Sequence, residues 1–397
     1  MGRAARTLAT APSRRVEIVD SLEPLRADWT RLAEASGNVF ATWEWNDLWW
    51  RHYGRGRTLR VGVVHDDGDG IDAIVPLYRW ARRPVRVLRL IGHGHGDRLG
   101  PVSRDDDAAA EEALRAALDA EPHDVFVGDW VAGNRGWARV LGGRVIRETG
   151  YPILRFADGS TETFLGGQSS RFRKSARNAR NRLERDHHVR YREPAAATLD
   201  DDLDSAYRLH HARFGEHKGC LFCGEHEAFQ RAFAACALDR GWLRLLLLEL
   251  DGEPVAFDYG FLFHDAYFAY QGGRDPAWDR KSVGFLLELE SIRRALADGV
   301  VEYRFLGGEE HYKYRYPTED PRLETVAAPA TPLGRAATSA LAATWRLRLG
   351  EALVRRFGSA RPDEAQRRRE RAEDDEVAAA GQGERAPGKG MEATEGE

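Results

Sequence analysis

A dense run of ionisable and aromatic side chains directly follows the pair Gly307 and Gly308. It contains two carboxylates, a histidine, two tyrosines, a lysine and an arginine: Glu309, Glu310, His311, Tyr312, Lys313, Tyr314 and Arg315. The mostly apolar residues 300–306 before it predict a strand, and the glycines give the backbone conformations that most residues avoid. Polar side chains gathered at a strand end are typical of a binding or catalytic site.

These residue types suit acyl transfer to an amine or a hydroxyl group. Such a reaction needs a proton acceptor and a positive group or hydrogen-bond donor for the developing oxyanion. We expect Lys313 to stabilise that oxyanion or to hold a phosphate of the acceptor. Glu309 or Glu310 can serve as the general base, and Tyr312 can protonate the leaving group. The alternatives are a surface lysine lying over its aromatic neighbours, solvated turn carboxylates and a packing tyrosine.

Two further candidates lie in the strands predicted before this segment. Asp258 interrupts the apolar run 255–261, and strand alternation places it on the face opposite Tyr259. A carboxylate there points outward, pairs with a buried base or serves the site, and we include it among the catalytic candidates. Tyr270, in the predicted strand 266–272, is a candidate for substrate binding.

A basic loop with one glycine precedes a predicted helix whose apolar residues recur at helical spacing over 285–296. The loop residues are Arg280, Lys281, Ser282, Val283 and Gly284. The first N–H groups of a helix have no partner within it and lie at the positive end of its dipole, which suits a phosphate. We expect this loop to bind the phosphates of an acyl donor, with a solvated basic turn as the alternative.

Seven basic residues lie within the predicted helix 171–185. They are Arg171, Arg173, Lys174, Arg177, Arg180, Arg182 and Arg185. Charge on nearly every helical face suits a polyphosphate, an acidic sugar nucleotide, tRNA or an anionic membrane surface. Arg173 and Arg177 are candidates for substrate binding. The alternative is a solvated helix that bridges two domains.

The run His217-x-x-Cys220-x-x-Cys223-x-x-His226 has the ligand types of a zinc site. Accepted ligand pairs usually come from two separated segments, and so tight a run suits a plain turn equally well. The glycine-rich run 92–97 is a weak metal candidate too, and it fits a loop over a cleft better. We therefore expect no metal.

The length of the chain predicts two domains that position these residues, because 397 residues exceed one compact core. We expect a flexible N-terminus over residues 1–15, a first domain over 16–158 and a second over 160–326. A basic amphipathic helix over 331–358 and a disordered, highly charged tail over 361–397 follow. Helices alternate with largely antiparallel strands in both domains, which predicts an α/β or α+β fold.

Charge and cysteine content exclude several classes of protein. The net charge of −4 argues against DNA binding. No apolar run approaches the roughly 20 residues that span a bilayer, and residues 1–11 lack the apolar core of a secretory signal. Three cysteines in so long a chain predict no disulfide framework and fit a reducing compartment. We expect a cytoplasmic protein, with peripheral membrane contact left open.

Three segments resemble a known family. They are NVFATWEWNDLWWRHYG, SSRFRKSARNARNRLERD, and DGEPVAFDYGF through GGEEHYKYRY. The last resembles a family pattern of Gly, two acidic or polar residues, any residue, Tyr and Lys, here Gly308 to Lys313. The chain is thus similar to GNAT acyltransferases of the CelD-like subfamily, with a BioF-like acetyltransferase domain, related to the FemAB and FemX aminoacyltransferases. The segments cover most of residues 16–326.

This resemblance implies tandem GNAT-like domains, each a mixed, largely antiparallel sheet flanked by helices. It implies a thioester or ester acyl donor and an amine or hydroxyl acceptor. Asp97 matches an acidic position in related sequences, which makes it a candidate acceptor-binding residue. Two features depart from the family pattern: Arg304 stands where an acidic residue is common, and the phosphate loop over 280–285 is only partly present.

The predicted function is a GNAT-type N-acetyltransferase. It would move an acyl group, with acetyl as the first expectation, from acyl-CoA to a small molecule or to a polysaccharide or cell-envelope precursor. No Ser-His or Cys-His nucleophile stands out, so attack is expected to be direct within a ternary complex. One alternative is a FemX-like transferase that uses aminoacyl-tRNA in cell-wall synthesis. Another is a non-catalytic component of a polysaccharide-synthesis complex, bound through the basic helix and residues 331–358.

Overall fold

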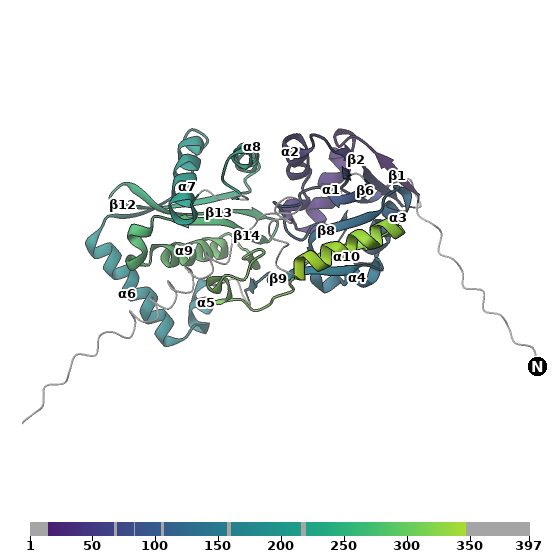
Figure 1. Ribbon diagram of the computed structural model, residues 1–397. Coiled ribbons are helices and arrows are strands. Elements are labelled where there is room, and N and C mark those ends of the chain that lie inside the picture. The colour runs from purple at the N-terminus through teal and green to yellow at the C-terminus, as the bar shows by residue number, and fades with distance from the viewer. Residues whose placement is uncertain are drawn as a thin grey trace, which may run out of the picture.

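Two lobes lie side by side, one purple to blue and one teal to green in Figure 1. They belong to a computed structural model, which describes residues 15–66, 70–82, 84–104, 107–156, 160–215 and 220–346. The flexible segment predicted before residue 15 and the tail predicted over 361–397 lie outside the described residues.

The first lobe holds two sheets. A four-stranded antiparallel sheet has the order β1-β3-β4-β7, and a six-stranded mixed sheet has the order β2-β5-β6-β8-β16-β9. The strands are β1 (Val16–Val19), β2 (Thr58–Leu59), β3 (Val61–His65), β4 (Ile71–Val75), β5 (Leu77–Arg82), β6 (Val85–Leu90), β7 (Val102–Ser103), β8 (Val125–Ala132), β9 (Arg144–Thr149) and β16 (Leu323–Pro329). The helices are α1 (Arg26–Ser36), α2 (Trp43–Tyr53), α3 (Asp107–Ala120), α4 (Trp137–Val140) and α10 (Pro332–Arg346).

The second lobe is one six-stranded sheet of order β10-β15-β14-β13-β12-β11. Its strands are β10 (Ile153–Arg155), β11 (Val189–Arg192), β12 (Leu243–Leu250), β13 (Glu253–Phe263), β14 (Ala266–Arg274) and β15 (Glu302–Arg304). Its helices are α5 (Thr161–Gly167), α6 (Ser170–Asp186), α7 (Leu199–Phe214), α8 (Glu225–Asp239) and α9 (Val283–Ala297). Helices α7 and α8 cover one face of this sheet and α6 and α9 the other (Figure 1). The mixed α/β architecture with helix-flanked sheets confirms the predicted fold class.

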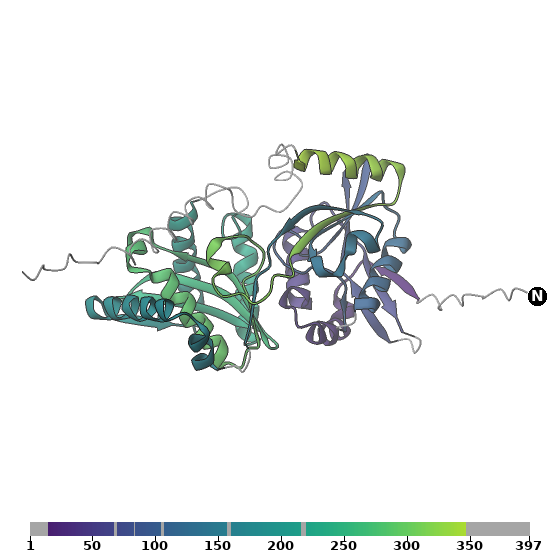
Figure 2. The same cartoon turned by 90° about the horizontal axis from the view of Figure 1, so that it is seen from below.

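The lobes exchange strands, so sheet membership does not follow the predicted boundaries at residues 158, 160 and 326. Strand β10, before residue 158, pairs with β15 of the second sheet. Strand β16, near the end of the predicted second domain, inserts between β8 and β9 of the first lobe. Helix α10, which covers residues 332–346 of the predicted basic helix, packs on that same lobe (Figures 1 and 2). The chain therefore crosses twice between the lobes.

An aromatic interface joins the lobes into one continuous core. Trp45 of α2 makes edge contacts with Phe229 and Phe233 of α8, and its lobe also places Phe40 against Phe268 of β14. The tryptophan-rich helix α2 is thus part of this core, with Trp43, Trp45 and Trp49 buried. Glu44 on the same helix is also buried, and it forms an ion pair with Arg240 across the interface.

No helix among the described residues is long and apolar enough to cross a membrane.

Candidate functional site

The second sheet opens between its two parallel strands. Strands β14 and β15 pair only over three residues, ending at Phe268 opposite Arg304, although β14 continues to Arg274. The pairing of β14 with β13 skips Tyr270, which forms a β-bulge one residue beyond Ala269. A bulge bends a strand and increases its twist, and this one lies two residues beyond the last β14 residue that pairs with β15. The two strands therefore do not pair with each other beyond Phe268 and Arg304.

The start of α9 lies at this edge, after the 3-10 turn η4 (Pro276–Lys281). Ser282 precedes the helix with a left-handed φ of 57°, and its side chain makes no cap hydrogen bond. A Cβ on Gly284 would lie 3.3 Å from Cδ of Arg274, so the glycine lets the arginine approach the first turn. The guanidinium donates from Nε to Asp279, 2.5 Å away. A positive group and the positive end of a helix dipole thus lie together.

The residues of the predicted donor-binding loop lie in different surroundings. Arg280 is exposed, whereas Nζ of Lys281 donates to Asp186 at 2.8 Å and is partly neutralised. The side chain of Val283 is fully buried in the core under α9, so only its backbone can face a ligand. Sequence reasoning missed Arg274. The signal was a basic residue at the end of a strand, directly before the loop.

The Gly-Gly turn has an unusual backbone. Leu306 is buried with a φ of 61°, and Gly308 has a φ of 146°. A Cβ on Gly308 would collide with the Glu310 carboxylate and lie 2.7 Å from Nζ of Lys313. Its backbone N–H donates to the Gly150 carbonyl at 3.0 Å. The glycine at position 308 is therefore required by both conformation and space, as the sequence predicted.

Asp97 holds the same turn from the other lobe. It is completely buried, and its Oδ2 accepts a hydrogen bond from the backbone N–H of Gly307 at 2.7 Å. Nδ2 of Asn38 donates to the Arg98 carbonyl at 3.2 Å and steadies the segment that carries Asp97. The structure thus places Asp97 against the Gly-Gly turn, although Asp97 and Gly307 lie 210 residues apart in the sequence. Contact of Asp97 with an acceptor stays a prediction.

Lys313 and Glu310 face the turn rather than open solvent. Nζ of Lys313 is 3.0 Å from the Gly307 carbonyl, to which it donates, and 3.0 Å from Oε2 of Glu310. Lys313 is buried and lies in the short turn η5 (His311–Tyr314). Glu309 is exposed and pairs with Arg322 at 3.3 Å. The catalytic roles of these residues and of the partly buried Tyr312 stay predictions.

Asp258 belongs to a buried polar network beneath the last paired residues of β14 and β15. Its Oδ2 accepts hydrogen bonds from Tyr267 and Ser291, each at 2.6 Å, and the Ser291 hydroxyl lies 3.0 Å from that of Tyr303. Burial raises the pKa of Asp258, while the two hydrogen bonds oppose that shift. The predicted outward-facing alternative is excluded. The network joins β13, β14, α9 and β15 where β14 and β15 are still paired, next to the point at which their pairing ends.

The predicted substrate-binding residues lie in different places. Arg173 is exposed on α6 and donates to the Gly166 carbonyl at 2.9 Å, which caps the end of α5. Arg177 is exposed on the same helix, which packs on α9 through Phe172. Tyr270 is buried between the lobes instead, where its hydroxyl donates to the His95 carbonyl at 2.9 Å.

Arg304, which departs from the family pattern, is a buried link between the lobes. Its Nε donates to Glu302 at 2.8 Å and its Nη1 to the Gly37 carbonyl of the first lobe at 3.0 Å. The guanidinium also lies 4.8 Å over the Phe268 ring. An arginine at this position stabilises the interface on one side of β15.

Histidines from both lobes meet across the interface. Nε2 of His95 lies 3.1 Å from Nδ1 of His226, which is also 3.0 Å from the Tyr53 hydroxyl. His93 of the same glycine-rich run contacts the Tyr78 hydroxyl at 2.7 Å through Nδ1. Burial lowers the pKa of His226, and burial together with Arg89 lowers the pKa of His93 well below its usual value. Both rings are therefore held neutral.

We expect the protein to lose thermal stability as the pH falls from about 7.5 to about 5.5, where a normal histidine gains its proton. The folded state disfavours protonated His93 and His226, whereas the unfolded chain binds those protons below about 6.5. The stabilisation is thus present above that pH and lost below it. Melting curves of the wild type and of a His93→Asn, His226→Asn double variant measure the effect. The double variant should lose most of this dependence, whereas His264→Asn, at an exposed hairpin turn, should keep it.

Strands β14 and β15 and the start of α9 all lie within one segment that matches a known family. Residues 170–314 match the family model described as an acetyltransferase (GNAT) domain. The second lobe is therefore a GNAT-type domain and the chain an acyltransferase, as the sequence predicted. Among curated proteins, none matches this chain in sequence.

Two solved structures share the arrangement of both lobes. FemX has a TM-score of 0.58 and 13% sequence identity, over 82% of this chain and 100% of FemX. The C-terminal domain of a putative lysylphosphatidylglycerol synthetase from Agrobacterium fabrum has a TM-score of 0.51 and 10% identity, over 84% of this chain and 97% of that domain. At these identities the likeness concerns the fold. It covers nearly all the described residues, so both lobes belong to the shared architecture.

Proposed function

We propose that the protein transfers an acyl group from acyl-CoA to an amine or a hydroxyl of a small molecule or of a sugar-linked, cell-envelope precursor. The observation that carries this proposal is the separation of β14 from β15 next to the start of α9. A thioester arm can lie where the two strands no longer pair with each other and bond to their backbone, while its pyrophosphate meets the helix N-terminus. We propose a cytoplasmic location for the reaction, where acyl-CoA is made.

The proposed step is direct displacement. The acceptor nitrogen or oxygen attacks the thioester carbonyl, the new C–N or C–O bond forms, and the C–S bond breaks. The acceptor proton leaves to a base, and the CoA thiolate takes up a proton to leave as the thiol. Backbone N–H groups of the bulged β14 are the proposed donors for the oxyanion.

The residues of the Gly-Gly turn take positioning roles in this proposal. Lys313 and Asp97 fix the two sides of Gly307, one through its carbonyl and the other through its N–H. A peptide held from both lobes keeps the rim of the strand opening in one conformation. Glu309 is the proposed base, since its carboxylate and its partner Arg322 are both exposed, whereas Glu310 pairs with the buried Lys313.

A thermal-shift screen with acetyl-CoA, longer acyl-CoAs and free CoA tests the donor class. A donor that binds only the folded state stabilises it by about 2.7 kcal/mol at a hundredfold excess over its Kd. We expect a rise in melting temperature with at least one acyl-CoA. No shift with any CoA species, in a protein that folds cooperatively, would contradict the proposal.

Arg274→Ala is expected to weaken acyl-CoA binding about tenfold to a hundredfold, the effect of losing a hydrogen bond to a charged group. The guanidinium lies beside the first turn of α9, where the pyrophosphate is proposed. Lys281→Ala is the matched control, because it also removes a cation paired with an aspartate, but its partner Asp186 lies on α6, whereas Arg274 pairs with Asp279 beside the first turn of α9. Titration calorimetry measures both. Equal losses in the two variants, or none in Arg274→Ala, would show that the phosphates do not bind here.

A second candidate function is transfer from aminoacyl-tRNA, which the family resemblance implies. The observation that favours it is the row of exposed basic side chains on α6, including Arg173 and Arg177, next to α9. Such a surface suits a polyphosphate backbone. Binding of charged tRNA that falls steeply with salt, without any stabilisation by acyl-CoA, would select this alternative.

A further inference from the structure

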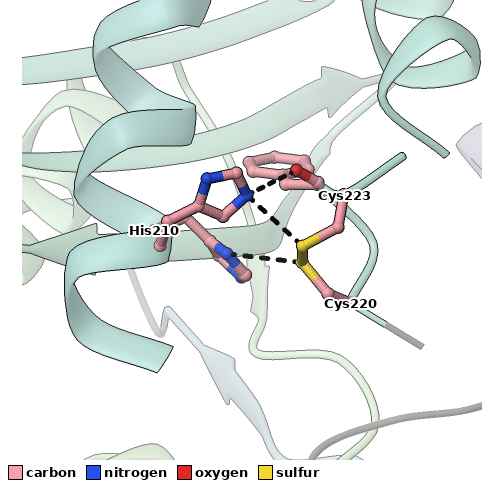
Figure 3. The surroundings of a disulfide bond; sticks show 5 residues. His210, Cys220 and Cys223 are labelled. Carbon is pink, nitrogen blue, oxygen red and sulfur yellow. Dashed lines mark hydrogen bonds between the residues drawn. A yellow bond between two sulfur atoms is a disulfide. The ribbon is translucent and has the colours of Figure 1, made fainter. Parts of the chain in front are cut away.

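Two histidines and two cysteines converge where α7 ends and α8 begins. His210 and His211 lie in the last turns of α7, and Cys220 and Cys223 lie in the turn before α8. Figure 3 shows the His210 ring and the two sulfur atoms facing one another. The ligand atoms of His210, His211 and Cys220 all lie within 4.8 Å of one another. No step of the proposed acyl transfer uses these side chains.

The set differs from the run that the sequence suggested. His226 contacts Tyr53 and His95 in the lobe interface instead, and His217 lies outside the described residues. The two histidines come from the neighbouring helix α7, so the ligand pairs stand on two separated segments. This is the arrangement that structural zinc sites normally have.

The distances fit a tetrahedral ion. Nδ1 of His210 lies 3.7 Å from Sγ of Cys220, and Nε2 of His211 lies 3.3 Å from Sγ of Cys223. With Zn–S near 2.3 Å and Zn–N near 2.0–2.1 Å, the N···S edge of a zinc tetrahedron is about 3.5 Å. Both observed distances lie within a few tenths of an ångström of that edge. His210 and Cys220 are also buried, which protects a bound ion from exchange.

We propose that His210, His211, Cys220 and Cys223 bind one zinc ion when the two cysteines are reduced. In the structure the cysteines form a disulfide, and the sulfurs of a zinc tetrahedron stand about 3.8 Å apart, so the disulfide and the metal exclude each other. A thiol reductant supplies the two electrons that open the disulfide. The two thiols then bind as thiolates and release two protons. Nε2 of His211, now 2.9 Å from the Phe222 carbonyl, exchanges that contact for the metal.

The ion would tie α7 and α8 to the strand that opens the sheet. A Cβ on Gly273 of β14 would lie 3.0 Å from Cα of His210, so the helix rests directly on that strand. Three residues after Cys223, His226 makes the contacts to the first lobe. Metal binding therefore stabilises a junction between β14, the two helices and the lobe interface, and its loss should loosen all three.

The test is the zinc content of the full chain, purified with a thiol reductant and measured by mass spectrometry of the metal. We expect about one zinc ion per chain in the wild type, as one tetrahedral site requires. Replacement by Co²⁺ should give the ligand-field spectrum of a tetrahedral ion with sulfur-to-cobalt charge transfer. Removing the metal with a chelator should lower the melting temperature under reducing conditions.

Matched variants separate the cluster from the rest of the chain. Cys220→Ser and His211→Ala should lose the metal, whereas Cys236→Ser and His187→Ala should keep it, because those residues lie outside the cluster. The cobalt spectrum of the wild type tests for sulfur ligation of the metal, and it does so even where a variant fails to fold. Reduced wild type that binds neither Zn²⁺ nor Co²⁺, or binds cobalt without sulfur ligation, overturns the proposal.

Discussion

Replacing Asp97 by alanine should lower acyl transfer about a hundredfold, the cost of a small misplacement at a reacting centre. The same change should reduce the free energy of unfolding by about 1–3 kcal/mol, since it leaves a buried N–H without its acceptor. The reason is the hydrogen bond from Gly307 to the fully buried Oδ2 at 2.7 Å. Without it, the first lobe no longer fixes the turn at the rim of the strand opening. Acetyl transfer or CoA release, with denaturant melts, measures both losses.

Asp97→Asn is the control for this prediction. Its amide oxygen can still accept from Gly307, so it should keep most of the stability that the alanine variant loses. Comparing the two variants separates the hydrogen bond from the charge. An alanine variant that is folded and as active as the wild type would show that the bond between the lobes does not position the site.

Part of this geometry could be predicted from the sequence, because it is encoded locally. Asp251 and Gly252, residue types that favour turns, both have positive φ values and form the hairpin turn between β12 and β13. The helical spacing over 285–296 falls within α9, and the strand predicted over 300–306 contains β15. In such places, turn residues and periodicity determine the backbone whatever the rest of the chain does. Gly308 belongs to the same group.

Long-range partners could not be predicted. Strand alternation placed Asp258 on one face, but the tyrosine and serine that bury it come from β14 and α9. The return of β16 to the first sheet depends on which edge is open, and no local pattern in residues 323–329 records it. Nothing near Glu44 in the sequence indicates that it is buried, because its partner, Arg240, lies 196 residues away. A charged residue is buried when such a partner exists, and sequence spacing does not show one.

The cysteines also have partners that their own sequence spacing did not predict. Their count predicted no disulfide framework, yet Cys220 and Cys223 are paired. The zinc run was judged on its own spacing, without the two histidines of α7. Those histidines were visible in the sequence, at the end of a predicted helix next to the run. Extending the search for ligands to the neighbouring helix would have found the cluster.

Replacing Gly308 by alanine should inactivate the enzyme and lower the free energy of unfolding by more than a glycine-to-alanine change at an open turn. The φ of 146° alone costs a residue with a Cβ about 1–3 kcal/mol. The new methyl would also collide with the Glu310 carboxylate and press on Lys313. Both side chains must then move, which breaks the bond from Lys313 to the Gly307 carbonyl, or the turn must refold. Either outcome moves the Gly-Gly turn that follows β15, where β14 and β15 no longer pair. Acyl transfer should therefore fall below detection.

Gly252→Ala provides the comparison that isolates this effect. Gly252 also has a left-handed φ, 92°, but a Cβ there would meet nothing within 4 Å. It should therefore cost only the backbone term, about 1–2 kcal/mol, and leave catalysis intact because the hairpin turn lies away from the Gly-Gly turn. Activity and denaturant melts of the two variants measure the difference. Equal losses in both would mean that the contacts of Glu310 and Lys313 around Gly308 contribute nothing, and that only backbone conformation matters at the turn.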